Sequence, residues 1–522
     1  MKSHDAFRWF RGFDNSMRTA LRPRFDHDRR RRAPCAGGRR LLLIQLDGVS
    51  RRRLEAAVRK GYAPFLGRLL DGGRFRISGC RSGAPASTPA FQAGLLYGVS
   101  PSVPGYLWWD RASGREFRMD SPVAVAAVEA GLATHNPGLL EGGTTYPAIF
   151  GGGARHCSIG GLGRDPSVIR YAPPRNGHGP VATEVRRSAA LTCLVGRMLG
   201  RLARGVVDGA MWSARCGRLL HEPTFLLNRV LCSCVFYEAA TSGVIADIAL
   251  GTPKIYCDFL AYDETAHRRG PGAGSSLLEL RAADRAIARI FAALASNPEL
   301  GYDVFIFSDH GNVEVTPFES LVGLSLSELL ARAAEGAPLG AGDGPRVRSS
   351  RVVTVEAGDY AHVYIRGRPA PLDREELRRD HQPLLDAVAG CDAIGVAGVR
   401  GGRRGYALVR GRTVDLADDG EVATLPHPEP RLLATYLSDL LSLAASGDLV
   451  LLGWRGPDLE SVAFAWEFGS HGSVAPEETN TFFIHPADCD FRFERVVRPD
   501  ELYRWFSRGY ASPAPCAPSD RR

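Results

Sequence analysis

Short apolar runs that stop at acidic or polar residues recur along the chain. The three clearest are Leu41–Leu46, Ile255–Leu260 and Phe305–Phe307. Runs of this length are typical of buried β-strands. The stretch after the first run, residues 51–70, has a helical pattern that is broken by a glycine and a proline. Because a strand followed by a helix is the opening of a parallel α/β sheet, the pattern predicts an α/β fold.

The residues that follow these runs are candidates for a site. Asp47 comes directly after the first run, and Asp309 and His310 follow the third run in the segment FIFSDHGN. A strand of an α/β sheet delivers its last side chains to the crevice at its carboxyl end, where ligands and metals bind. An isolated Asp-His pair is more often a helix cap beside a surface histidine, so a site here requires further ligands elsewhere in the chain.

A second pair of candidate ligands follows the strand Ile255–Leu260. Asp263 and His267 are four residues apart, which places them on one face of a helical turn where they can share one divalent ion. Asp258 and Glu264 compete for this role. Asp258 lies within the strand, however, and Glu264 would point away from His267.

The segment GAPASTPAFQAGLLYG predicts a helix that begins beside a hydroxyl group. Pro89 suits the first turn, which places Thr88 at the helix N-terminus, and Gly98 ends the helix. The free amides and the positive end of the helix dipole favour an anion there. A hydroxyl in that field could attack phosphorus if a metal lowered its pKa, although plain N-capping by Ser87 and Thr88 also fits the pattern.

One histidine near the C-terminal end extends the set. His471 lies in the segment FGSHGS, where a single histidine is usually an ordinary loop residue. Its position in the order of the motifs favours a ligand. The segments LDGVS, STPAFQAGLLYG, DETAHRRGP, SDHGN and SHGS follow one another as in the alkaline phosphatase superfamily. The chain most closely resembles the type I phosphodiesterase / nucleotide pyrophosphatase family of that superfamily.

The resemblance implies an alkaline-phosphatase-like fold, with a central, mostly parallel sheet flanked by helices, and a site for two divalent metal ions. The ligands would be the acidic and histidine residues of the motifs, one zinc ion held by Asp263, His267 and His471 and the second by Asp47, Asp309 and His310. Thr88 would bind the second ion as the nucleophile. Mn²⁺ would tolerate the same residue types as Zn²⁺.

The function that the resemblance implies is hydrolysis of phosphate esters. Thr88 would attack phosphorus in line and form a phosphothreonine intermediate, which water would hydrolyse. Phosphodiesterase is the activity we expect. A phosphomonoesterase or phosphotransferase on the same metal site is the alternative, and Ser87 is the weaker candidate nucleophile. The alternative from another class is a non-catalytic protein with a degraded core that binds a membrane or nucleic-acid surface.

Four residues near the nucleophile are candidates for substrate binding. The phosphodiesterase branch usually has an Asn three residues after its Thr, and this chain has Phe91 there. Gln92 could donate a hydrogen bond instead, although its direction differs by about 100° on a helix. Trp108 and Trp109 could stack on a base or a lipid headgroup, and a place in the core fits them equally well. The choice between diester and monoester therefore stays open.

The chain between the motifs predicts insertions into one catalytic domain, residues 41–510. Residues 99–250 are too long for a loop, and the stretch Ser188–Ile248 is helical and amphipathic, which suggests a cap. Residues 313–465 contain short strand patterns that predict a smaller α+β subdomain. We expect residues 511–522 to form a disordered tail.

Positive charge is concentrated at the N-terminal end. Residues 1–40 contain twelve Lys and Arg against four Asp, a net charge of +8 that equals the net charge of the whole chain. A basic arm with interleaved aromatic residues could rest on an anionic membrane, and a disordered, solvated leader has the same composition. We expect no specific recognition of nucleic acid.

The sequence shows no secretory signal and no membrane span. The arm has no apolar region followed by a small-residue cleavage site, and no later segment offers about 20 uninterrupted apolar residues. The 11 cysteines form no CxxC pair and no disulfide-like spacing. We therefore expect a cytoplasmic protein that contacts the membrane through residues 1–40 and takes a small phosphate ester as its substrate.

Overall fold

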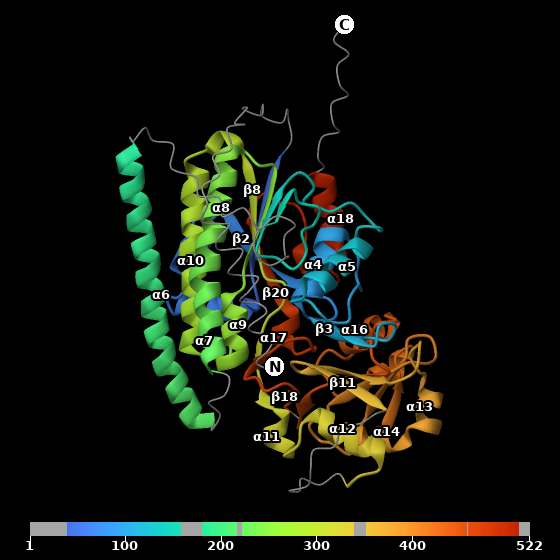
Figure 1. The fold of residues 1–522 in the computed structure, drawn as a ribbon. Helices are drawn as coiled ribbons and strands as arrows, with labels where there is room; N and C mark the ends of the chain where they lie inside the picture. The colour runs from blue at the N-terminus through green and yellow to red at the C-terminus, as the bar shows by residue number, and fades with distance from the viewer. Residues whose placement is uncertain (1–38, 158–179, 217–221, 339–350, 457, 511–522) are drawn as a thin grey trace.

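A seven-stranded β-sheet forms the centre of the computed structural model, which describes residues 39–157, 180–216, 222–338, 351–456 and 458–510 (Figure 1). The strand order is β2-β20-β8-β1-β7-β5-β6. The bounds, in that order, are Phe75–Arg81, Asn480–Pro486, Tyr302–Phe307, Arg40–Leu46, Lys254–Phe259, Thr144–Tyr146 and His156–Cys157. The five strands from β8 to β6 are parallel, and β20 runs antiparallel to both of its neighbours. The predicted α/β fold with a mostly parallel central sheet is confirmed.

Helices cover both faces of this sheet because its central strands are apolar on both faces. One face carries α2 (Arg51–Arg59), α3 (Pro64–Asp71), α8 (Tyr237–Leu250) and α10 (Gly274–Ala295), and the other carries α4 (Thr88–Tyr97), α5 (Pro122–Leu132) and α18 (Asp500–Gly509). Along β1, Leu42, Ile44 and Leu46 pack toward the first group. Leu41 and Leu43 pack toward the second. The central strand is thereby buried between two helical layers (Figure 1).

The ends of the first helices follow from single residues. Ser50 caps α2 by accepting a hydrogen bond from the Arg53 backbone N at 3.2 Å. Pro64 occupies the first turn of α3, where its missing N–H removes no helical hydrogen bond. α4 begins directly after Ser87 and ends at Gly98, whose φ of 67° lies in the left-handed region that favours glycine.

A second, antiparallel sheet forms from the later part of the chain. Its strand order is β11-β12-β16-β13-β14-β15. The bounds, in that order, are Val352–Ala357, Tyr360–Ile365, Leu449–Leu452, Val396–Val399, Tyr406–Val409 and Arg412–Asp415. The strand patterns recognised in residues 313–465 fall on β11, β12 and β14. The domain boundaries themselves stay predictions.

Five helices pack against this second sheet or beside it. They are α12 (Leu326–Glu335), α13 (Arg374–Asp380), α14 (Gln382–Ala389), α15 (Asp419–Val422) and α16 (Pro430–Ser442). Short elements link the two sheets: β3 (Leu107–Asp110), β4 (Arg115–Arg118), β9 (Val313–Glu314), β10 (Thr316–Pro317), α11 (Phe318–Val322), β17 (Trp454–Arg455), β18 (Glu460–Ala463), β19 (Gly469–Ser470) and α17 (Pro476–Thr479). Two 3₁₀ turns lie at Pro298–Leu300 and Phe493–Arg495.

Long helices lie outside the first helical layer. α6 (Pro180–Cys216) is followed by α7 (Glu222–Val230) and a π-helical turn (Leu231–Phe236) that leads into α8. Among the described residues, the stretch Phe225–Leu250 is long and apolar enough to cross a membrane, and 71% of its most apolar window is buried inside the protein. Burial of this extent is typical of a helix in the core of a protein. The cap role of this region stays a prediction, and the arm up to residue 38 and the tail from residue 511 lie outside the described residues.

Candidate metal centre

Three acidic side chains lie together because the central strands are in parallel register. Gln45 of β1 is paired with Asp258 of β7 and with Phe307 of β8. Asp47 and Asp309 each lie two residues beyond this row, so both follow the carboxyl ends of neighbouring strands. The register therefore brings the carboxylates of Asp47, Asp258 and Asp309 to one edge of the sheet.

The N-terminus of α4 brings Thr88 to this edge. Thr88 Oγ1 lies 3.4 Å from Asp47 Oδ1 and 3.1 Å from His310 Nε2. The first amides of a helix have no partner within it and, with the helix dipole, favour an anion at this position. Ser87 is the N-cap residue of α4, and its buried Oγ has no hydrogen-bond partner. Of the two hydroxyls, the one that contacts the site is that of Thr88.

The remaining residues come from α9 (Ala261–Arg269) and from the loop after β19. Asp263 Oδ2 lies 3.2 Å from His267 Nε2, and Asp263 Oδ1 lies 3.8 Å from His471 Nε2. The rings of His310 and His471 are stacked, with centroids 3.7 Å apart. The structure thus gathers all seven residues of the sequence-derived set into one cluster: Asp47, Thr88, Asp263, His267, Asp309, His310 and His471.

Two groups of donor atoms in this cluster have the spacing of a metal site. Within each group the atoms lie no more than 4.8 Å apart: Asp47, Asp309 and His310 form one group, and Asp263, His310 and His471 form the other. The first group equals one of the two expected ligand sets. The second group contains His310 where the expected set has His267, so His310 belongs to both groups. The division of ligands between two ions stays a prediction.

Each histidine of the cluster turns the same ring nitrogen toward a backbone carbonyl. Nδ1 lies 3.0 Å from Gly469 O in His267, 3.3 Å from Gly311 O in His310 and 2.8 Å from Ala86 O in His471. Because a carbonyl oxygen only accepts hydrogen bonds, each neutral ring donates from Nδ1 and keeps the lone pair on Nε2. The three Nε2 atoms face the acidic residues, and this tautomer is the one an Nε2-bound metal requires.

Burial and mutual repulsion shift the pKa values in the inner part of the cluster. Burial, and then the charge of Asp309, raise the pKa of Asp47 well above its usual range. Burial and the charge of Asp263 raise the pKa of Asp309 to about 7. Burial also lowers the pKa of His310 to about 4 and that of His471 to about 3. Without a cation, the inner cluster therefore favours protonated acids and neutral imidazoles.

The outer part of the cluster behaves in the opposite way. Although burial alone would raise it, the pKa of Asp263 is lowered by the imidazoles of His267 and His471. Although burial alone would lower it, the pKa of His267 is raised well above its ordinary value by Asp263 and Glu467. Asp263 and His267 form an ion pair that a bound cation would replace.

The residues present fit a divalent cation. Asp309 Oδ2 and Asp258 Oδ1 are buried and have no hydrogen-bond partner. An unpartnered buried carboxylate oxygen is unfavourable, and a cation would provide its partner. Mixed carboxylate and imidazole ligands suit Zn²⁺.

Two residues beside the cluster were not predicted as site residues from the sequence. Glu467 Oε2 lies 3.1 Å from His267 Nδ1, and Asn312 Nδ2 donates to Asp263 Oδ1 at 2.7 Å. Such outer partners orient the ligands of a metal. Asn312 is the last residue of the motif SDHGN, and Glu467 lies four residues before His471. Their closeness to motif residues was the available signal.

Gly48 shows how tightly this part of the site is packed. Its φ is 71°, and a Cβ at this position would lie 2.3 Å from Asp263 Oδ1 and 2.5 Å from Asn312 Nδ2. No side chain fits there without displacing the acidic residue. The LDG motif therefore needs its glycine so that β1 and α9 can approach each other.

The four residues expected to bind substrate are not among the cluster residues. Gln92 is fully buried and accepts hydrogen bonds from Ile149 N at 2.9 Å and Phe150 N at 3.2 Å. Phe91 is buried and stacks on Phe307, Trp108 is buried and stacks on Phe117, and Arg366 lies over the ring of Trp109. Phe91, Gln92 and Trp108 have core contacts, because α4 and β3 pack against the rest of the protein there.

The two competing acids are placed differently. Asp258 lies beside the cluster, and Gln92 Nε2 donates to its Oδ2 at 3.4 Å. Glu264 is exposed. Neither belongs to the two groups of donor atoms described above.

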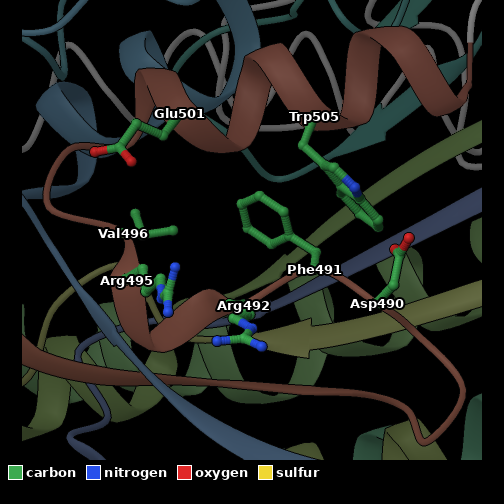
Figure 2. A pocket seen from close by; sticks show the side chains of 7 residues that line it. All are labelled: Asp490, Phe491, Arg492, Arg495, Val496, Glu501 and Trp505. Carbon is green, nitrogen blue, oxygen red and sulfur yellow. The ribbon is translucent and has the colours of Figure 1, made fainter.

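A separate hollow of about 420 Å³ lies beside α18 (Figure 2). Phe491 and Trp505 stack along it with ring centroids 4.9 Å apart, and Arg492 and Arg495 lie nearby. None of the cluster residues lines this hollow.

The fold and the cluster are those of a metal-dependent hydrolase of phosphate esters. The chain belongs to the type I phosphodiesterase / nucleotide pyrophosphatase family, whose model matches residues 41–389, about two thirds of the chain. The resemblance seen in the motifs is confirmed, and with it membership of the alkaline phosphatase superfamily. The protein is therefore an enzyme, and the non-catalytic alternative has no support.

Solved structures with a similar course of the chain include two hydrolases. One is phosphonoacetate hydrolase from Sinorhizobium meliloti 1021 in complex with phosphonoacetate, at 14% identity and a TM-score of 0.46, with 91% of this chain and 96% of that chain covered. The other is an inactive form of murine ectonucleotide pyrophosphatase / phosphodiesterase 5 in complex with AMP, at 10% identity and a TM-score of 0.47, with 90% and 95% covered. A search of the curated proteins finds no match.

The pKa shifts predict how the stability of the metal-free protein depends on pH. Raised pKa values of Asp47, Asp258 and His267 stabilise the fold at low pH, and this contribution is lost as pH rises through the folded-state values. His310 and His471, with lowered pKa values, have the opposite effect, which grows little once the pH exceeds their unfolded-state value of about 6.5. We therefore expect the melting temperature of chelator-treated protein to fall between pH 6.5 and 8.5.

Zinc-loaded protein serves as the control for this measurement. Metal ions replace the protons in the cluster, so its melting temperature should change much less over the same pH range. Equal pH dependence of the two forms, measured by calorimetry, would contradict the assignment of the shifts to a metal site.

Proposed function

We propose that the protein is a phosphodiesterase with two zinc ions and that Thr88 is its covalent nucleophile. The observation that carries this proposal is the position of Thr88 Oγ1, 3.4 Å from Asp47 Oδ1 and 3.1 Å from His310 Nε2 at the N-terminus of α4. Thr88 as a whole is 8% exposed, so little water competes for its hydroxyl. A nucleophile, an anion-binding helix end and a cluster of metal ligands meet at one point.

Each group of the cluster then has a role. Asp47, Asp309 and His310 would hold one ion and Asp263, His471 and His267 the other, with His310 within reach of both. Bound at these residues, two divalent ions would neutralise the charge of the phosphate and lower the pKa of the Thr88 hydroxyl. Glu467 and Asn312 are positioning residues that hold His267 and Asp263.

The proposed reaction has three steps: phosphate binding, attack by Thr88 and hydrolysis of the intermediate. The amides at the start of α4 hold phosphate oxygens near Thr88. Thr88 Oγ loses its proton and attacks phosphorus, a new P–O bond forms, and the bond to the leaving group breaks on the opposite side; the released alkoxide takes up a proton and departs as the alcohol. Water then cleaves the phosphothreonine, which releases the phosphate product and restores the hydroxyl.

The presence of Phe91 in place of an Asn supports a second candidate activity at the same site, that of a phosphomonoesterase or phosphotransferase. The phosphodiesterase branch carries an amide at this position, whereas Phe91 stacks in the core and Gln92 is engaged with the backbone of residues 149 and 150. A phosphate pocket without this amide is also compatible with a phosphomonoesterase or a phosphotransferase. A panel of chromogenic diesters, monoesters and sulfate esters, tested with zinc-loaded protein, distinguishes these activities.

The composition of residues 1–40 supports a location at the membrane. Their net charge of +8 fits a peripheral contact with anionic lipid in the cytoplasm. Deleting residues 1–38, which precede β1 and the contacts of Arg39 and Arg40, should weaken binding to anionic vesicles at low salt and leave turnover of a small soluble ester unchanged.

Replacing Thr88 tests the nucleophile. Thr88→Ala should keep the fold and the bound metal and lose about a thousandfold or more in turnover, because among the described residues no other hydroxyl bonds to the side chains of Asp47 and His310. Ser87→Ala is the matched control and should keep activity within a fewfold range. Acid-quenched wild-type protein should show a phosphate on the peptide that contains Thr88. An inactive Ser87→Ala with a normal Thr88→Ala would transfer the role to Ser87.

Counting bound metal tests the ligands. Mass-spectrometric analysis should find about two zinc ions per wild-type chain, and about one after Asp309→Asn or His471→Ala. His310→Ala should reduce both sites, because His310 belongs to both groups of donor atoms. The exposed His135 provides the control, so His135→Ala should keep two ions. Unchanged stoichiometry in all of the ligand variants would remove the two-metal proposal.

A further inference from the structure

The long helix α6 turns charged side chains toward the protein. Arg201 forms an ion pair with Glu279 of α10, which is fully buried. Asp208 Oδ2 lies 2.8 Å from Arg269 Nε of α9. The contacts that hold α6 on the helices beneath it therefore include ion pairs with buried partners.

The opposite side of α6 is apolar and exposed. Six large apolar side chains there are between 43% and 60% exposed: Val195, Leu199, Leu202, Val206, Val207 and Met211. At 100° per residue they cover an arc of about 180°, and at 1.5 Å per residue they extend over about 24 Å. Figure 1 shows α6 at the outer edge of the helical layer, with no described element beyond it.

This arrangement is the reverse of that in a helix at a water-exposed surface. Such a helix turns its apolar stripe inward and its charges outward. Rotating α6 about its axis would bury the apolar stripe, but it would also remove Arg201 from buried Glu279, which would keep only Arg229 as a partner, and it would change the contacts of Asp208. Loss of a partner from a buried ion pair is strongly destabilising. The apolar side therefore stays outward, and a contiguous exposed apolar surface of this kind marks an interaction site.

The charges beside the apolar arc indicate which kind of partner fits this face. Arg204 is exposed along one border of the arc, and Arg197 beside it is also exposed but pairs with Glu238 of α8 at 2.8 Å. The only acidic residue between Leu194 and Ala214 is Asp208, which pairs with Arg269. A second copy of the chain would present the same positive border, whereas an anionic bilayer offers the opposite charge together with an apolar interior.

We propose that the outer face of α6 lies on the surface of an anionic lipid membrane. Its apolar side chains enter the boundary between headgroups and acyl chains, and Arg204 reaches the headgroups. This contact is separate from that of the basic arm, because apolar insertion persists at salt concentrations that screen surface charge.

Vesicle co-sedimentation of the full chain tests the proposal. The vesicles contain equal amounts of phosphatidylglycerol and phosphatidylcholine, and binding is measured in about 0.5 M salt, where the Debye length is below 8 Å. The double variant Leu199→Glu and Val206→Glu should bind at least tenfold more weakly than the wild type. The matched control is Val123→Glu with Val497→Glu, which adds the same charge at exposed valines outside α6 and should bind like the wild type.

A second measurement needs no variant. Backbone hydrogen exchange in residues 195–211 of the wild type should be slower with the same vesicles present than without them. Protection in this segment supports the proposal even if the α6 variant fails to fold.

Other occupants of the face give different results. Equal weakening of both double variants would assign the effect to net charge and overturn the proposal. A change from dimer to monomer in the α6 variant alone would assign the face to a second copy. A wild type that neither binds the vesicles nor gains protection, with an α6 variant of lower melting temperature, would show that the chain itself covers the face.

Discussion

Repulsion between buried carboxylates at one edge of the central sheet is the constraint on which the site depends. The register of β8, β1 and β7 is set by apolar side chains that fill both helical layers, and it leaves Asp47, Asp258 and Asp309 side by side. No described Lys or Arg side chain pairs with them. A cation would therefore stabilise this part of the fold. The described groups that contact the carboxylates include imidazoles and the hydroxyl of Thr88.

The histidines are held in an orientation suited to that charge. Backbone carbonyls bind Nδ1 of all three rings, so that Nε2 faces the acids. Those carbonyls belong to the loop before α4, the loop after β8 and the strand β19, which are far apart in sequence. The site is consequently a product of the whole fold, since His471 and Glu467 reach it only when the second sheet packs beside the first.

Much of the core could be predicted because its elements are defined by local patterns. Apolar runs that end at Asp47 and Asp309 describe strands buried on both faces, and Pro89 with Gly98 defines α4. The seven candidate ligands could be grouped because their motifs have a fixed order. That His310 belongs to both groups of donor atoms could not be seen, because ring positions depend on the packing of separate loops.

Other features depend on tertiary contacts that no local pattern contains. Gln92 was a candidate for phosphate binding; in the structure its Oε1 accepts from two backbone N–H groups of the segment around Ile149, and its Nε2 donates to Asp258. The periodicity of α6 identifies an amphipathic helix but does not say which face turns inward. Buried Glu279, on another helix, decides that question by its ion pair with Arg201.

Anomalous diffraction from zinc-loaded crystals, recorded above and below the zinc absorption edge, tests the central claim most directly. The account predicts two peaks about 4 Å apart, one beside Asp47 and Asp309 and the other beside Asp263 and His471. Absence of anomalous density at these side chains, or zinc bound only elsewhere on the protein, would contradict it.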